Sequence, residues 1–280
     1  MNRAPTTVRA LVLAIAVAAG FGPAAAQYRA AVVSNEVFRV CADPSNLPFS
    51  NKDGQGFENK IAELIAAELK LPLQYFWMPS GPGFIRNTLG TKLCDVVIGY
   101  AAGAEIVQNT NPYYRSAFVL ITKKDSPLAD VTTLADPRLK DKRIGIIAGT
   151  PPSDYVLKYG LMGKAKPYAL IVDRRYDSPA EQMLADIAKG DIDAGVLWGP
   201  IGGYFATKAS VPMVVTPLVK DKDGPPMAFR ITFGTRFGES EWKHRLNDVI
   251  KARQNDIDKV LVSFGVPILD ESDRPITPKP

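Results

Sequence analysis

The amino-acid sequence predicts an α/β fold with two lobes, each built on its own sheet, joined by two strands. Three observations predict this fold. Short, continuously apolar strands alternate with helices that are apolar on one face, as in parallel sheets. This alternation starts twice, near residues 38 and 143. No long flexible linker separates the two series, and the extended stretches 113–122 and 229–233 connect them, which indicates a hinge.

The first series opens with a strand over residues 38–42, and a loop containing Asp43 and Pro44 begins at its C-terminal end. The helix that follows has Ile61 and Ile65 on one apolar face. After the first strand we expect a helix, a strand, a helix and a strand, over residues 58–69, 73–77, 83–92 and 95–99.

The second series has a similar order and ends in a long helix. Its strands and helices are expected over residues 143–147, 153–159, 181–189, 193–198, 229–233 and 241–264. The predicted domains are lobe 1, residues 27–115 plus 234–280, and lobe 2, residues 116–233, with the hinge near 113–122 and 229–233. We expect the polar, proline-rich stretch 270–280 to be loosely ordered.

The N-terminus has the pattern of an export signal. Arg3 and Arg9 lie at its head, an apolar run over residues 10–19 is too short to span a bilayer, and the small residues 24–26 suit cleavage before Gln27. Residues 1–26 are therefore predicted to be a signal peptide, and the predicted location is the periplasm. No later segment has about 18 uninterrupted apolar residues, so no membrane span is expected after signal removal.

Charge and composition disfavour several classes of function. The signal contains two of the 34 basic residues and none of the 29 acidic ones, which leaves a net charge of +3. Bases alternate with acids, as over residues 140–143 and 220–223, which indicates a solvated surface and no nucleic-acid binding. His244 is the single histidine and falls on an exposed helix face, and no cysteine cluster or EF-hand spacing occurs. We therefore expect no metal site built by this chain.

Cys41 and Cys94 leave two alternatives open. An exported chain meets an oxidising compartment, which favours a disulfide between them. However, Cys41 lies late in one predicted strand and Cys94 just before another, so neighbouring parallel strands in matched register would keep the sulfur atoms too far apart. In that case both are small buried apolar side chains. Neither belongs to a Cys-x-x-Cys or haem-attachment pattern, which disfavours a redox site.

The order of these motifs resembles the type II periplasmic solute-binding protein fold over about residues 37–267. The stretches that carry the resemblance are Cys41-Ala42-Asp43, Pro48-Phe49, Gly56-Phe57-Glu58-Asn59-Lys60, Cys94-Asp95-Val96-Val97-Ile98-Gly99, Pro112-Tyr113-Tyr114-Arg115-Ser116 and the turn Gly149-Thr150. The resemblance implies two α/β lobes joined by a two-strand hinge, with a ligand cleft between them. Strand ends and helix N-termini meet at such a cleft and suit an anion, and Gly149-Thr150 resembles the anion-holding turn of the second lobe.

One departure from the amino-acid binders of that fold bears on the ligand. Those proteins clamp the ligand carboxylate with an arginine shortly after the strand that ends here at Gly99, and they hold the ammonium with an aspartate of the second lobe. Residues 101–105 contain no base, and Trp198 stands at the acidic position. Buried charges left unpaired cost several kcal/mol, so an ordinary amino acid is not the expected ligand.

A narrower group within the fold resembles this chain more specifically: the MxaJ/XoxJ proteins, which are quinoprotein-dehydrogenase-associated binding proteins encoded with periplasmic methanol dehydrogenases. The matching stretches are residues 40–51, 56–62, 83–89 and 94–97. The resemblance is greatest to the XoxJ branch, which accompanies the lanthanide-dependent enzyme. It implies a monomeric, non-enzymatic accessory protein that binds or activates the dehydrogenase and meets its cytochrome c. Pyrroloquinoline quinone (PQQ) and a lanthanide or calcium ion are expected in the partner, and no cofactor in this chain.

Ten residues are candidates for a cleft that takes a partner or a small-molecule ligand: Asp43, Phe49, Phe57, Arg86, Gly99, Tyr100, Tyr113, Gly149, Thr150 and Trp198. Aromatic side chains are common in pockets and interfaces, and Tyr100 and Trp198 follow strand ends, where a cleft opens. Each candidate has a structural alternative. Asp43 could cap its own turn, Phe57 could belong to the core and Arg86 could be solvated.

Two other functions stay open. The chain could be the receptor of an ABC importer for an unidentified small solute, with the lobes closing around that solute. It could also be an enzyme, because a dehydratase of aromatic amino-acid synthesis shares this fold, but the sequence shows no clear pair of acid and base residues for such a reaction.

Overall fold

The computed structural model describes Met1 and residues 33–279, and the rest of the predicted signal peptide, residues 1–26, lies outside the described residues. The strands are β1 (Phe38–Ala42), β2 (Ser45–Asn46), β3 (Ser50–Asn51), β4 (Leu73–Trp77), β5 (Val96–Ala101), β6 (Gln108–Asn109), β7 (Tyr114–Lys123), β8 (Ile144–Ile147), β9 (Lys166–Tyr168), β10 (Ala194–Trp198), β11 (Met213–Pro217) and β12 (Ala228–Thr235). The helices are α1 (Phe57–Leu69), α2 (Phe84–Asn87), α3 (Pro151–Lys158), α4 (Pro179–Lys189), α5 (Gly199–Thr207) and α6 (Ser240–Ser263), with 3-10 turns at Pro137–Leu139 and Met162–Lys164. None of the helices in this part of the chain combines the length and the hydrophobicity needed to cross a lipid bilayer.

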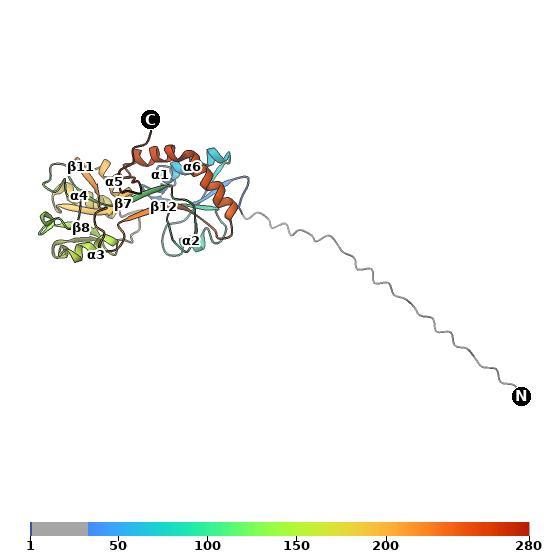
Figure 1. Ribbon diagram of the computed structural model, residues 1–280, viewed down its shortest axis with the longest axis horizontal. Coiled ribbons are helices and arrows are strands. Elements are labelled where there is room, and N and C mark those ends of the chain that lie inside the picture. The colour runs from blue at the N-terminus through green and yellow to red at the C-terminus, as the bar shows by residue number, and fades with distance from the viewer. Residues whose placement is uncertain (2–32, 280) are drawn as a thin grey trace. The chain divides into compact units, whose positions relative to one another are not determined.

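Ten strands form one mixed sheet in the order β4-β1-β5-β12-β7-β10-β8-β9, with β6 beside β12 and β11 beside β7. At one end β1 is parallel to β4 and β5, and at the other end β8 is parallel to β9 and β10. The antiparallel strands β7 and β12 pair between them, with residues 114–117 opposite 228–231 (Figure 1). The two predicted sheets are therefore continuous through the two predicted connecting strands.

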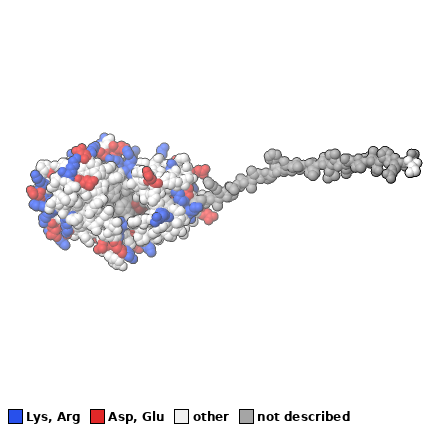
Figure 2. Space-filling model, turned by 90° about the horizontal axis from the view of Figure 1, so that it is seen from below, with Lys and Arg blue, Asp and Glu red and all other residues white. Residues whose placement is uncertain are grey.

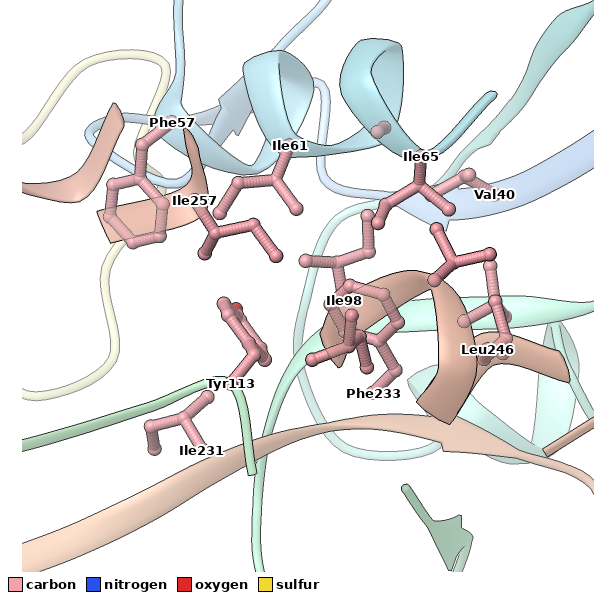
Figure 3. Packing of buried hydrophobic residues seen from close by; sticks show 14 of the residues in the cluster. Val40, Phe57, Ile61, Ile65, Ile98, Tyr113, Ile231, Phe233, Leu246 and Ile257 are labelled. Carbon is pink, nitrogen blue, oxygen red and sulfur yellow. The ribbon is translucent and has the colours of Figure 1, made fainter. Parts of the chain in front are cut away.

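We call β1, β4, β5, α1, α2 and α6 the first half, and β8 to β11 with α3 to α5 the second half; β7 and β12 run between them (Figure 1). In the first half, α1 and α6 contact each other and pack on the sheet. Ile61 and Ile65, one helical turn apart, share a buried cluster with Phe233 of β12 and with Leu246 and Ile257 of α6 (Figure 3). Full burial of side chains of this size stabilises by about 1.5–3 kcal/mol each, so this cluster anchors the C-terminal helix to the N-terminal one.

Of the two alternatives for the cysteines, the structure has the disulfide: Cys41 and Cys94 are bonded, with their Cα atoms 5.5 Å apart. The expectation that parallel strands would separate them is wrong because the residues before β5 do not continue the line of that strand. β5 begins at Val96, and the residues before it turn toward β1, where the Asp95 N–H donates to the Arg39 carbonyl oxygen at 2.9 Å. Both cysteines are buried.

A buried carboxylate beside the disulfide is held by two arginines. Asp95 is 1% exposed and accepts from Arg39 Nε at 2.7 Å and Nη2 at 2.6 Å, and from Arg236 Nη2 at 2.8 Å. Arg236 also donates to the carbonyl oxygens of Leu89, at 3.2 Å, and Cys94. Fork-shaped contacts between guanidinium and carboxylate groups are among the stronger hydrogen bonds in proteins. They tie together β1, the turn before β5 and the segment after β12.

The second half contains a helix that the sequence analysis does not predict. α5 contains Pro200 and several glycines, which have low helix propensity. These glycines are required by close packing, because a Cβ at Gly203 would overlap the carbonyl oxygen of Gly265, just after α6. In the same half, Met183 of α4 packs over Gly195 of β10, where any larger residue would collide with it. Close approach of backbones therefore decides the local sequence here.

Two expectations about local order are wrong. α2 is a single turn rather than a helix over residues 83–92, because the chain leaves helical geometry at Thr88, with φ −121° and ψ −82°. The stretch 270–279 is tied to the rest of the molecule, since Asp273 lies 2.6 Å from Arg115 of β7. The polar side chains of this stretch therefore form ion pairs that fix it to the rest of the molecule.

The described surface carries mixed charge. On the face shown in Figure 2, basic and acidic side chains are interspersed. The alternating stretch 140–143 behaves in this way: Arg143 pairs with Asp193 at 3.4 Å, and Asp141 pairs with Lys164 at 3.6 Å. These exposed charges of both signs agree with the solvated surface that the sequence predicts.

Candidate functional site

A cavity of about 630 Å³ lies where the loop after β1 meets the second half. The first half contributes side chains from residues 44–53. The second half contributes the ends of β8 and β10, the starts of α4 and α5, and the β9–α4 loop, residues 169–178. Cavities of this size hold small organic molecules, and the carboxyl ends of parallel strands are where ligands bind in such sheets.

Aromatic rings form part of the cavity wall. Trp198 ends β10, and its ring lies 5.4 Å from that of Phe118 and 5.8 Å from that of Phe229. Phe49 lines the cavity from the loop after β1, and its ring lies 5.2 Å from that of the buried Phe57. Rings packed in this way give a rigid apolar surface, which suits a flat apolar group.

Asp43 lies next to Pro44, which lines the cavity, and is 4% exposed. Its carboxylate accepts the N–H of Ser45 at 2.8 Å and that of Ser80 at 2.6 Å, so it does cap its own turn. It also meets the second half, because Arg174 Nη1 lies 3.6 Å from Asp43 Oδ2 and donates to the Ser80 carbonyl oxygen at 3.4 Å. Arg174 is not predicted from the sequence, because nothing in the pattern of its loop marks it as reaching another part of the chain.

A second carboxyl group near Asp43 was also not predicted. Glu58 follows Phe57 in the first turn of α1, and a Cβ at Gly99 would overlap its Oε1 atom. Gly99 has φ +86°, so the role of this glycine is to leave room for Glu58 at the end of β5. Burial raises the pKa of the Glu58 carboxyl well above its usual range, and the negative charge of Asp43 raises it further. One sequence feature could have pointed to Glu58: an acidic residue directly follows the aromatic Phe57 at the start of a helix.

The turn Gly149-Thr150 offers little to an anion. Pro151 and Pro152, the first residues of α3, have no N–H group. The N–H and hydroxyl groups of Thr150 both bond to the Ile147 carbonyl oxygen, at 3.4 Å and 2.6 Å, and the Ser153 N–H bonds to the Thr150 carbonyl oxygen at 2.9 Å. The donors of the predicted anion-holding turn are therefore mostly used inside the turn, although Thr150 does line the cavity.

The other candidates do not line the cavity. Phe57 and Tyr113 are core residues, 0% and 1% exposed, and within residues 33–279 the Tyr113 hydroxyl has no hydrogen-bond partner. Arg86 and Gly149 are exposed, and Tyr100 packs against the cluster around the disulfide. Of the ten predicted residues, the structure thus brings Phe49, Thr150 and Trp198 to the cavity, and it places Asp43 beside the lining residues Pro44 and Arg174. Among residues 33–279, no group of three or more His, Cys, Asp and Glu side chains could hold a metal ion.

Known proteins match this chain over most of its length. Residues 38–262 match the bacterial extracellular solute-binding proteins, family 3. Protein MoxJ of Methylorubrum extorquens is 30% identical over an alignment of 253 residues, and the match covers 84% of this chain and 82% of MoxJ. The structure of periplasmic binding protein XoxJ from Methylobacterium extorquens AM1 has 46% identity and a TM-score of 0.72, and the match covers 84% of this chain and 100% of XoxJ. MxaJ from Methlophaga aminisulfidivorans MPT has 25% identity and a TM-score of 0.72, with 83% of this chain and 100% of MxaJ covered.

These matches confirm the predicted resemblance to the type II periplasmic binding fold and to the MxaJ/XoxJ group. They agree with the mixed sheet, with its two series of parallel strands joined by β7 and β12. The chain belongs to the bacterial extracellular solute-binding proteins, family 3.

Proposed function

We propose that this chain works in the periplasm as an accessory protein of a PQQ-dependent methanol dehydrogenase, which it binds or activates. The observation that carries the proposal is the 46% identity to XoxJ over the whole length of that protein. The MxaJ/XoxJ group is encoded with such dehydrogenases, and its XoxJ branch accompanies the lanthanide-dependent form. PQQ and the metal ion, a lanthanide or calcium, then belong to the dehydrogenase and not to this chain.

The side chains of the cavity support a role other than amino-acid capture. Trp198 stands where amino-acid binders of this fold place an acid, and its ring packs against Phe118 and Phe229. Residues 101–105 supply no arginine for a carboxylate. A free amino acid would therefore lack, at these two positions, the acid and the arginine that hold its ammonium and carboxylate in those binders, and a buried charge without a partner costs several kcal/mol.

The β9–α4 loop offers a surface to a protein partner. Leu170, Ile171 and Tyr176 are 51%, 79% and 79% exposed. The Arg175 guanidinium lies 5.3 Å from the centre of the Tyr176 ring and pairs with Asp173 at 2.6 Å, so the loop holds these groups in a defined arrangement. Exposed aromatic and arginine side chains of this kind are enriched in protein interfaces.

The test is to run the mature chain with purified methanol dehydrogenase on a size-exclusion column and to measure dye-linked turnover with and without it. We expect co-elution and a higher turnover. The double substitution Ile171→Ser, Tyr176→Ser should weaken the complex about tenfold or more, because it removes two exposed apolar anchors. Val262→Ser is the matched control, since Val262 is 42% exposed but lies on α6. Separate elution together with unchanged turnover would contradict the proposal.

A second candidate is the receptor of an importer for a small solute, and the cavity of about 630 Å³ favours it. Calorimetry of the mature chain against small periplasmic solutes tests this function. A receptor should bind one of them with a Kd of about 1 μM or below, accompanied by a change in small-angle scattering as the halves close.

A further inference from the structure

We infer that Arg174 is a clasp that holds the cavity closed and keeps cationic ligands away from Asp43. Arg174 comes from the β9–α4 loop of the second half, whereas Asp43 and Ser80 belong to the loops after β1 and β4 in the first half. Its Nη1 atom lies 3.6 Å from Asp43 Oδ2 and 3.4 Å from the Ser80 carbonyl oxygen. This role does not depend on whether the ligand is a protein or a small solute.

Asp43 is a preorganised seat for a cation. Two backbone N–H groups, of Ser45 and Ser80, hold its carboxylate at 2.8 Å and 2.6 Å, and only 4% of the residue is exposed. A negative charge that is fixed and mostly shielded from water attracts a cation more strongly than a solvated one does. The cation found there is the guanidinium of this same chain. Arg174 therefore takes the place that an ammonium or guanidinium group of a ligand would take.

The contacts of Arg174 with Asp43 and Ser80 are weak enough to break and re-form. Charge-assisted N–H···O bonds are usually about 2.7–2.9 Å long, and both contacts of Arg174 are longer. The Arg174 side chain is also 41% exposed. Ion pairs that are long and partly exposed are weak and are screened by salt, so this pair closes the cavity without locking it.

The neighbouring cations do not share this position. Arg175 is directed to Asp173, at 2.6 Å, and lies over the Tyr176 ring. Lys52 lines the cavity from the first half, and within residues 33–279 no ion pair joins it to an acid. Arg174 is thus the cation set against Asp43 across the two halves. A cationic ligand must displace it, whereas a neutral or anionic ligand does not compete for Asp43.

Fluorescence quenching tests the clasp. Trp198 lines the cavity, so the rate at which acrylamide quenches its emission reports how often the cavity opens. Trp77→Phe removes the partly exposed second indole, and Trp242, 6% exposed, contributes little. In this background we expect Arg174→Gln to raise the quenching constant about threefold to fivefold. Sodium chloride at about 0.5 M should raise it in the parent and leave Arg174→Gln unchanged.

A binding measurement tests whether Arg174 keeps cationic ligands away from Asp43. Agmatine carries a guanidinium group like that of Arg174 and serves as the probe in calorimetry. If the clasp occupies Asp43 about two-thirds to four-fifths of the time, which corresponds to the expected change in quenching, its removal should tighten agmatine binding about threefold to fivefold. The double substitution Asp43→Asn, Arg174→Gln should lose this gain, because the seat itself has lost its charge.

Lys52→Gln is the matched control, because it removes one positive charge from the cavity lining and leaves the clasp intact. Arg174→Lys is the second variant. It keeps the positive charge, so we expect a smaller rise in the quenching constant and a smaller gain in agmatine binding than for Arg174→Gln. Circular dichroism melting checks that each variant folds. Arg174 is not a clasp if Arg174→Gln and Lys52→Gln quench alike. It does not protect Asp43 if Arg174→Gln and the parent bind agmatine equally.

Discussion

The two halves satisfy a buried carboxylate in different ways. In the first half Asp95 is held by the guanidinium groups of Arg39 and Arg236, and a disulfide lies next to it. In the second half Asp221, 4% exposed, accepts from the Thr133 hydroxyl at 2.7 Å and the Leu134 N–H at 3.0 Å. In the first half a disulfide and two guanidinium groups thus hold the start of β5, whereas the donors to the buried carboxylate of the second half are uncharged.

This difference bears on the cavity. Cys41 lies two residues before Asp43, so the cross-link steadies the strand end that carries the carboxylate. Arg174 lies on a loop with three large exposed apolar side chains. The fixed side of the site thus belongs to the first half and the adaptable side to the second half. A partner or ligand is then met by a rigid surface that carries Asp43 and by a loop that can adjust.

The largest effect should come from the disulfide. The bonded cysteines are 53 residues apart, and in the chain-entropy model closing a loop of that length stabilises by about 4 kcal/mol. We expect Cys41→Ala, Cys94→Ala to lower the free energy of unfolding in urea by that amount. A reducing agent should destabilise the wild type and leave the double variant unchanged. Equal stability of the two proteins would contradict a structural role for the bond.

Removing the charge of Asp95 should have the next largest effect. Asp95→Asn removes the carboxylate that Arg39 and Arg236 share, while Arg236 keeps its ion pair with Glu239 at 2.6 Å, and we expect a cost of about 3 kcal/mol. Asp221→Asn strands no charged group and should cost about 1 kcal/mol. Urea unfolding measures the loss in free energy of unfolding for both variants. Equal losses would contradict the proposed difference between the halves.

Packing in the second half should respond to a single methyl group. Gly203→Ala places a Cβ against the Gly265 carbonyl oxygen, a backbone atom that cannot move aside, so α5 must shift. We expect a loss of about 2 kcal/mol in thermal or urea unfolding. Gly163→Ala is the control, because a Cβ there would have no heavy atom within 4 Å. If both variants were as stable as wild type, close approach would not limit α5.

The smallest effect concerns Glu58 and depends on pH. Because its pKa is raised in the folded protein, the stability that protonated Glu58 contributes is full below its unfolded pKa, about 4.3, and is lost as the pH rises through the folded value. We expect Glu58→Gln to exceed wild type in free energy of unfolding near about pH 8, because the neutral amide avoids the cost of a buried charge. Near about pH 4 the two should match.

Urea unfolding across this pH range checks the expectation. Glu63→Gln is the control, since Glu63 is exposed and pairs with Lys60 on the same helix. If wild type and Glu58→Gln lost stability in parallel between these pH values, the carboxyl group would not be the cause.

Much of the fold follows from local pattern. β1 and β4 fall on the predicted residues, and α4 and α6 begin and end within two residues of them, because apolar runs and helical faces are properties of neighbouring residues. α5 and the single-turn α2 could not be predicted in this way. The glycine-rich helix α5 is stable because it packs closely against β7 and the end of α6. The sequence of α5 alone does not reveal this contact.

The site was predicted less fully, for a related reason. Trp198 and Phe49 could be found because a strand end or a proline-rich loop places them where a cleft opens. Arg174 could not, since its partner Asp43 lies 131 residues earlier and the pairing depends on how the two halves meet. Cys41 and Cys94 illustrate the same limit, because the turn before β5 decides their distance and strand register does not.

The position of α6 has a consequence for the making of the protein. It is the last helix, yet Leu246 and Ile257 complete the core around α1, near the start of the described chain. Synthesis delivers the N-terminal segment first, and export led by an N-terminal signal delivers it first to the oxidising compartment. Cys41 can thus meet Cys94 early, while the apolar face of α1 stays uncovered until nearly the whole chain has emerged. A chaperone that shields Ile61 and its neighbours would have this interval in which to act.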